Sequence, residues 1–183
     1  SNPDAWQYRL VNIYELDVLP KEEQLLAALK RLGEKHEVLR SAIIYDGVKQ
    51  ARQAIIDRKL PVFMEDFSDR EDKEGAVYAL REKILSENYD LQKKPLFQLY
   101  CVKKSDDSCY LLTATHHIIV DGWCFDLYQK DLFRFIAEEM EGVTQDETNE
   151  AAKGKYEDAV REILNKDKRA GLEYWRTLLS GYE

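Results

Sequence analysis

Imidazole is the scarcest chemistry-bearing side chain in this sequence. The 183 residues contain three histidines, His36, His116 and His117, so a histidine that moves a proton near neutral pH must be one of these. Two of them open the segment His116-His117-Ile118-Ile119-Val120-Asp121-Gly122. This segment joins a predicted strand to a predicted helix, and clefts tend to form where strands end. The segment is therefore the first candidate for a reactive site.

The alternation of side chains along the preceding strand separates the two histidines. Even-numbered residues from Tyr110 to His116 share one face, and odd-numbered residues from Leu111 to His117 share the other. The first face is apolar, which predicts that His116 packs inward. The second face becomes polar toward its end, which predicts that His117 points into a wetter space. His117 is therefore the candidate catalytic residue.

Other kinds of site find little support in the sequence. Adjacent strand residues point to opposite faces, so His116 and His117 could not readily share an ion, and there is no H-E-x-x-H motif. No metal is therefore expected. The chain also lacks a G-x-S-x-G nucleophile elbow and the glycine patterns that bind dinucleotides or phosphates. A structural interpretation stays open, since the histidine pair can be packing and Asp121-Gly122 suits a helix cap.

The composition limits the class of partner. The net charge is −8 and the pI about 5.1, so the basic surface that nucleic acids and anionic membranes require is missing. Three cysteines without a C-x-x-C spacing favour a reducing, cytoplasmic setting over a disulfide scaffold. No apolar run approaches the ~20 residues of a membrane span, and the first residues do not resemble a signal peptide. The length fits one domain, or one lobe of a larger domain.

The hydrophobic pattern predicts strands mixed with helices. Strands are expected over residues 6–16, 41–45, 96–102 and 109–115. A further strand is expected to follow the turn at 46–47 and to end at residue 55, and a second turn is expected at 105–108. Helices are expected over 20–36, from an S-x-x-E capping box at 68–71 to about 89, after 122, and around 156–163 and 172–179. The polar stretch 141–154 is a predicted linker. The aromatic residues Trp6, Tyr8, Trp123 and Trp175 are expected in the core.

These elements predict an α/β fold of the α+β type. We expect a two-layer sandwich in which helices pack on one side of a mixed, largely antiparallel sheet.

The segments that carry chemistry resemble the condensation-domain superfamily of nonribosomal peptide synthetases. Residues 116–122 match the HHxxxDG motif, and Trp123-Cys124 continues it much as Gly-Trp-Ser does in peptide-bond-forming members. Residues 35–40 look like the R-H-E-x-L-R segment, with lysine in the first place. Residues 156–160 resemble Y-x-D-F-A-V without its phenylalanine, and Tyr174-Trp175 with the leucines that follow resembles the Y-W-x-x-x-L helix.

The HHxxxDG motif alone is only moderately specific. It is shared with related acyltransferases, epimerisation domains and wax-ester synthases. Four matching segments in the right order are more specific, and the Gly122-Trp123 pair favours condensation over epimerisation.

The resemblance implies a lobe with the chloramphenicol-acetyltransferase-like fold. Residues 1–183 would form the amino-terminal lobe of a condensation domain. The family's S-x-A-Q-x-R-like segment would lie before residue 1 and the carboxyl-terminal lobe after residue 183. The family's active site lies in a tunnel between the two lobes, so the isolated lobe is expected to be inactive.

The resemblance also implies the reaction and the residues' roles. An acyl or peptidyl thioester would be joined to an aminoacyl amine, both delivered by the phosphopantetheine arms of upstream and downstream peptidyl carrier domains, with no cofactor bound directly. His117 would accept a proton or position the amine, and the Gly122 N–H would approach the oxyanion. Asp121 would pair with Arg40 in a structural role, and His116 would lie behind His117.

Two alternatives remain at this point. One is a stand-alone acyltransferase that makes esters or amides from a thioester donor. The other is a non-catalytic docking lobe.

Overall fold

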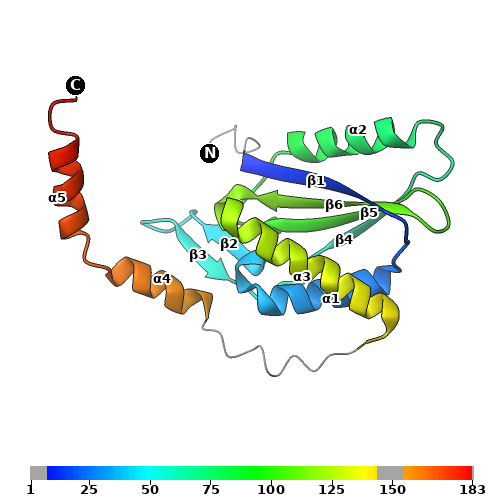
Figure 1. Cartoon of the computed structure of the whole chain (residues 1–183), viewed down its shortest axis with the longest axis horizontal. Coiled ribbons are helices and arrows are strands. Elements are labelled where there is room, and N and C mark those ends of the chain that lie inside the picture. Colours follow the sequence, from blue (N-terminus) through cyan, green and yellow to red (C-terminus); the bar gives the residue numbers. More distant parts are fainter. Residues whose placement is uncertain (1–7, 144–154, 183) are drawn as a thin grey trace. The chain divides into compact units, whose positions relative to one another are not determined.

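The computed structural model describes residues 8–143 and 155–182 (Figure 1). The chain divides into two compact units, residues 1–146 and residues 147–183. The boundary falls inside the predicted linker 141–154, of which residues 144–154 lie outside the described part.

The first unit is built on a four-stranded sheet in the order β1-β6-β5-β4. These strands are β1 (Arg9–Leu16), β4 (Val62–Asp66), β5 (Phe97–Lys103) and β6 (Cys109–His116). β6 pairs antiparallel with β1 and with β5, whereas β4 pairs parallel with β5. The predicted mixed, largely antiparallel sheet is confirmed.

A separate hairpin joins β2 (Ser41–Ile44) to β3 (Arg52–Ile55). Gly47 lies in the turn with φ of 71°, a conformation that side-chain-bearing residues rarely adopt. The hairpin predicted from Asp46-Gly47 is therefore confirmed.

Strand β4 was not among the predicted elements. Its five residues do not alternate between apolar and polar, and Phe63 and Met64 are both exposed. Its parallel pairing with β5 depends on residues more than thirty positions away, which a local pattern cannot contain.

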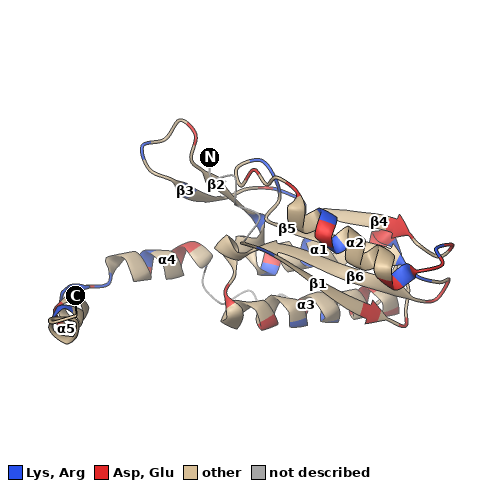
Figure 2. Ribbon diagram, turned by 90° about the horizontal axis from the view of Figure 1, so that it is seen from above, with Lys and Arg blue, Asp and Glu red and all other residues tan. Residues whose placement is uncertain are grey.

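Helices cover both faces of the sheet, which corrects the predicted two-layer arrangement. Helices α1 (Glu22–Lys35) and α3 (Gly122–Glu141) pack against one face, where Leu29, Leu111 and Phe135 belong to one buried cluster. Helix α2 (Lys73–Ser86) covers the other face, where Val77 and Leu112 belong to a second cluster. Every residue of β6 is buried, and Figure 2 shows this central strand without Lys, Arg, Asp or Glu. A strand that is buried on both faces requires a cover on each.

Helix α2 begins later than the S-x-x-E pattern predicts. Its cap is Asp72, whose Oδ1 accepts a hydrogen bond from the Gly75 N–H at 2.7 Å. Ser68 instead bonds to Asp66 Oδ1 through both its N–H, at 2.9 Å, and its hydroxyl, at 2.6 Å. That turn ends β4, and it engages the hydroxyl of Ser68 that the capping box would have needed. The predicted capping box is therefore wrong.

The second unit consists of α4 (Tyr156–Asn165) and α5 (Arg169–Leu178), as the two helical patterns predicted. Neither helix has a buried residue. Three of the aromatic residues expected in the core are exposed, Tyr8, Trp123 and Trp175, so that expectation is wrong, and Trp6 lies outside the described residues. No helix in the described part of the chain is long and apolar enough to cross a membrane.

We predict that the buried residues of α3 account for most of what this helix contributes to the stability of the first unit. Leu132 is fully buried, whereas Leu127 on the same helix is 65% exposed. Leu132→Ala should lower the free energy of unfolding by about 2–5 kcal/mol through lost burial and a cavity. Leu127→Ala should change it by less than about 0.5 kcal/mol. Urea unfolding of the two variants measures both values, and equal effects would contradict the packing described here.

Candidate active site

The end of β6 is fixed to α3 by a buried hydrogen bond. Thr115 Oγ1 and Tyr128 OH lie 3.1 Å apart, and both side chains are buried. Burial raises the pKa of the Tyr128 hydroxyl well above its usual range, so the phenol stays neutral. A short 3-10 turn, η3 (His117–Ile119), follows β6 and leads to α3. The bond therefore ties the strand that precedes the turn to the helix that follows it.

His116 is the last residue of β6 and is 4% exposed, so it packs inward as the alternation predicted. Its ring lies 6.4 Å from that of Tyr8 and 6.2 Å from that of Tyr89, measured between ring centres. Its Nδ1 accepts a hydrogen bond from the Ile118 N–H at 3.1 Å. His116 is thus part of the framework that shapes the turn.

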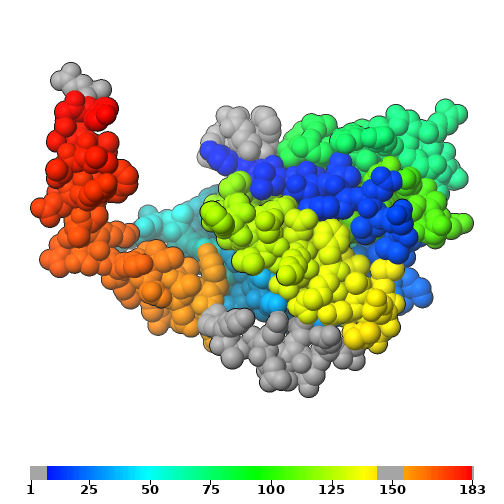
Figure 3. Space-filling view, viewed as in Figure 1, coloured from blue at the N-terminus to red at the C-terminus, as the bar shows by residue number. Residues whose placement is uncertain are grey.

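His117 begins η3 and is exposed, as predicted. The face of β6 that was expected to become wetter is buried, since Thr113 and Thr115 are 1% and 0% exposed, so the exposure of His117 comes from the turn and not from the strand face. The chain leaves the sheet here and turns into α3. In the space-filling view this turn and the start of α3 reach the surface near the beginning of β1 (Figure 3). His117 is therefore open to a second molecule or a further part of a protein.

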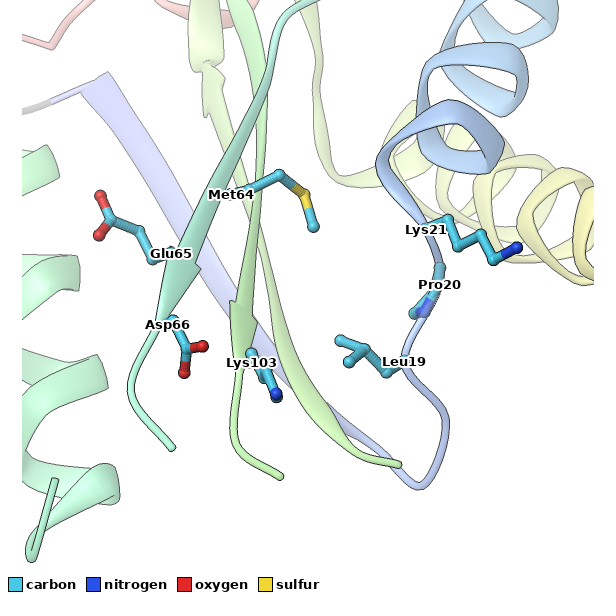
Figure 4. A pocket seen from close by; sticks show the side chains of 7 residues that line it. All are labelled: Leu19, Pro20, Lys21, Met64, Glu65, Asp66 and Lys103. Carbon is cyan, nitrogen blue, oxygen red and sulfur yellow. The ribbon is translucent and has the colours of Figure 1, made fainter. Parts of the chain in front are cut away.

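An open pocket in the described part of the chain lies apart from this site. It has a volume of about 360 Å³ and is lined by residues such as Leu19, Met64 and Lys103 (Figure 4). Lys103 pairs with Cys109 at the start of β6, whereas His116 is at its other end. The cavity thus lies at the opposite end of the sheet from His117.

Asp121 caps α3 instead of pairing with Arg40. Its Oδ1 accepts hydrogen bonds from the Trp123 N–H at 3.0 Å, the Cys124 N–H at 2.9 Å and the Cys124 Sγ at 2.8 Å. The bonds from Cys124 and Trp123 hold the pKa of the Asp121 carboxyl below its usual range. The exposed carboxylate is satisfied by the free N–H groups of the helix end.

Arg40 is satisfied elsewhere by backbone carbonyls. Its Nε donates to Gly33 O at 2.8 Å and its Nη1 to Ile56 O at 3.2 Å. Arg40 therefore fastens η2 (Glu37–Arg40) to α1 and to the chain after β3. Among the residues that the structure describes, the expected Arg40–Asp121 ion pair is not formed, and that expectation is corrected.

The segment that contains His36 contacts α3 at a different point. His36 Nε2 lies 2.7 Å from Asp131 Oδ2, and Lys35 Nζ lies 3.1 Å from Asp131 Oδ1. Although burial alone would raise it, the pKa of Asp131 is lowered by His36, Lys35 and Arg134. His36 thus connects the end of α1 to α3, a structural role that differs from the one expected of His117.

Gly122 is the first residue of α3 and is exposed. A Cβ added there would meet no atom within 4 Å, so packing inside this unit does not require glycine. The Asp121 carboxylate takes the N–H groups of Trp123 and Cys124, not that of Gly122. The Gly122 N–H therefore lies at the free, positive end of the helix, where anions are stabilised.

The sequence did not reveal the residues that hold this site in place. Tyr8, Tyr89 and Tyr128 contact the end of β6 from three different parts of the chain. Tyr8 was expected in the core as an aromatic residue, and no sequence pattern marked any of the three as a support of the site. In the described ranges, no group of three or more His, Cys, Asp or Glu side chains is arranged to hold a metal ion.

Comparison with known proteins identifies the family. A model of the condensation domain matches residues 3–183. Bacitracin synthase 3 of Bacillus licheniformis is 29% identical over 164 residues, which are 87% of this chain and 2% of that protein. Tyrocidine synthase 3 of Brevibacillus parabrevis is 29% identical over 157 residues, 85% of this chain and 2% of that protein. The chain belongs to the condensation-domain family, and it spans only a small part of the length of these relatives.

Solved structures show the same fold. The starter condensation domain of rhizomide synthetase superposes with a TM-score of 0.83 at 19% identity, over all of this chain and 44% of that one. The epimerization domain from the third module of tyrocidine synthetase B superposes with a TM-score of 0.80 at 17% identity, over 98% of this chain and 42% of that one. The predicted fold class is confirmed, and the chain spans less than half the length of these domains.

We predict that Tyr128 and Thr115 are coupled energetically. Tyr128→Phe removes the hydroxyl and leaves a buried Thr115 oxygen without this partner, which should lower stability by about 1–3 kcal/mol. Thr115→Val should cost less once Tyr128→Phe is present than it does alone. A double-mutant cycle measured by urea unfolding gives the coupling, and additive effects would contradict the bond.

We predict that Asp121→Ala folds and melts at a slightly lower temperature than the unsubstituted chain near neutral pH. Since the pKa of Asp121 is lowered in the folded state, its stabilisation is present above its unfolded pKa of about 4 and disappears as pH falls through the folded value. The difference in melting temperature should therefore vanish in acid. Arg40→Ala should add to Asp121→Ala without coupling, whereas a strongly non-additive pair would restore the ion-pair interpretation.

Proposed function

We propose that this chain supplies the catalytic wall of a peptide-bond-forming site. Its substrates would be an acyl or peptidyl thioester and an aminoacyl thioester, each tethered to a peptidyl carrier domain by a phosphopantetheine arm. The observation that carries the proposal is the exposed His117 at the end of a buried strand, one short turn before the free end of α3. Membership in the condensation-domain family supports the substrate class.

The chemistry needs little from the protein besides placement. The acceptor nitrogen attacks the thioester carbonyl, so a C–N bond forms while the carbonyl oxygen gains negative charge. The C–S bond then breaks, the thiolate leaves, and the nitrogen loses a proton. Two tethered substrates already meet at high effective concentration, so one well-placed imidazole and one oxyanion donor would suffice.

His117 is assigned to the attacking nitrogen. It would hold the amine in line with the carbonyl or accept its proton, because it is the exposed member of the histidine pair. His116 is assigned to the support of the turn through its bond to the Ile118 N–H.

Gly122 is assigned to the carbonyl oxygen. Its N–H lies at the start of α3, where the helix dipole stabilises a developing negative charge. The open space around its Cα would let a substrate approach the backbone closely. Asp121 would hold this helix end in shape through its three hydrogen bonds.

We predict that His117→Ala in the complete polypeptide, with both carrier domains loaded, slows amide formation by about 10²-fold or more. His36→Gln is the matched control, because it removes a different imidazole and retains a group that can bond Asp131. It should stay within about two-fold of the unsubstituted rate. Product formation by single-turnover mass spectrometry measures both, and full activity of His117→Ala would refute the proposal.

A further inference from the structure

Arg9 is a buried cation next to the histidine pair, and no sequence pattern singled it out. Its side chain is 1% exposed, and Glu87 lies 3.6 Å away. The guanidinium lies over the Tyr89 ring, 4.2 Å from its centre, and donates to Gln98 Oε1 at 2.9 Å. It also donates to the Ile84 carbonyl at the end of α2, where the helix dipole favours a cation. These contacts offset the cost of burying the charge.

Arg9 and His116 are direct neighbours across two strands. The register of β1 and β6 pairs the two residues, and the side chains of such a pair lie on one face with Cβ atoms about 5 Å apart. Tyr89 touches both, since it lies under the Arg9 guanidinium and stacks on the His116 ring at an interplanar angle of 21°. A positive charge that cannot be lost near neutral pH therefore lies beside the His116 imidazole.

The hydrogen bond from Ile118 requires a particular form of His116. A backbone N–H can only donate, so the Nδ1 that accepts from it at 3.1 Å must carry a lone pair. A protonated imidazole has N–H groups at both ring nitrogens and could not accept this bond. Protonation of His116 would therefore release the turn that carries His117.

We propose that Arg9 is a positioning residue for the condensation reaction. Its charge keeps His116 neutral, and neutral His116 holds the turn that presents His117 to the substrate. The inference rests on the proposed function, because it concerns the same imidazole. An apolar side chain could fill the space of Arg9 as well or better, so the charge itself is what the proposal requires.

The other groups around the ring leave this positive field in place. Burial raises the pKa of Tyr89 to about 12, so this phenol stays neutral. Glu87 is the nearby carboxylate, and it is shared between Arg9 and Lys94, whose Nζ lies 2.5 Å from it. Other titratable or charged groups near the two tyrosines or the His116 ring are Tyr8, Arg58, Glu65 and Tyr100.

The first test follows the three imidazoles of the 183-residue chain by NMR as pH is lowered. In Arg9→Met, His116 should bind a proton about ten-fold more tightly than in the unsubstituted chain. Gln98→Glu should act in the same direction, because a carboxylate against the guanidinium weakens its field, and this variant keeps the volume of the core. Arg81→Met is the matched control, since Arg81 also joins α2 to β1, through Val11 O at 3.3 Å, without touching His116.

The second test measures amide formation by the complete polypeptide. Arg9→Met should lower kcat by about ten-fold and leave KM within about two-fold of the value for the unsubstituted polypeptide. The acid limb of its pH–rate profile should move to higher pH. Arg9→Lys retains the charge and should return the acid limb of the pH–rate profile to its position in the unsubstituted polypeptide. Arg81→Met should leave both kcat and the pH–rate profile unchanged.

Two results would overturn the inference. One is a His116 that titrates at the same pH in Arg9→Met, Gln98→Glu and the unsubstituted chain. The other is a shifted titration with unchanged kcat and pH profile. Failure of the proposed function has a different signature, because the unsubstituted polypeptide would then form no amide while the NMR shift would still appear.

Discussion

The end of strand β6 is held from both faces of the sheet at once, and the geometry of the site depends on this. On one face Thr115 bonds to Tyr128 of α3. On the other, the buried His116 ring lies near the rings of Tyr8 and Tyr89, and Arg9 is its neighbour across the strand pair. A chain fixed on both sides has little freedom in the residue that follows it. His117 therefore leaves the sheet in one direction, at a set position relative to the start of α3.

Helix α3 receives a second set of constraints along its length. Near its carboxyl end Arg31 of α1 bonds to Glu138 and Glu139, and Asp131 bonds to the segment around His36. At its start the Asp121 carboxylate satisfies two N–H groups of the first turn. Polar contacts at both ends and apolar packing in between fix where the helix begins. The Gly122 N–H thereby acquires a defined place relative to β6.

The sequence could predict features that depend on the repeat of apolar residues along a single helix or strand. It could not predict contacts between residues that are distant in the sequence and that only the fold brings together. The burial of His116 on an apolar face follows from the two-residue repeat of a strand. The exposure of His117 does not, because both faces of β6 are buried and His117 lies in the turn that follows the strand. Strand β4 and the covering of the second face by α2 depend on non-local pairing, so the pattern missed them. The Arg40–Asp121 pair was carried over from the family, but here each group finds nearer backbone partners. Arg9 gave no signal, because a charged residue within a strand pattern normally indicates an exposed position.

The most direct test of the account is the structure of the complete domain with an amine analogue of the tethered acceptor bound. We expect the His117 ring within hydrogen-bond reach of the acceptor nitrogen, about 3 Å, and the Gly122 N–H directed at the carbonyl oxygen position. A His117 ring enclosed in apolar packing, with no path by which a pantetheine arm could reach it, would contradict the account.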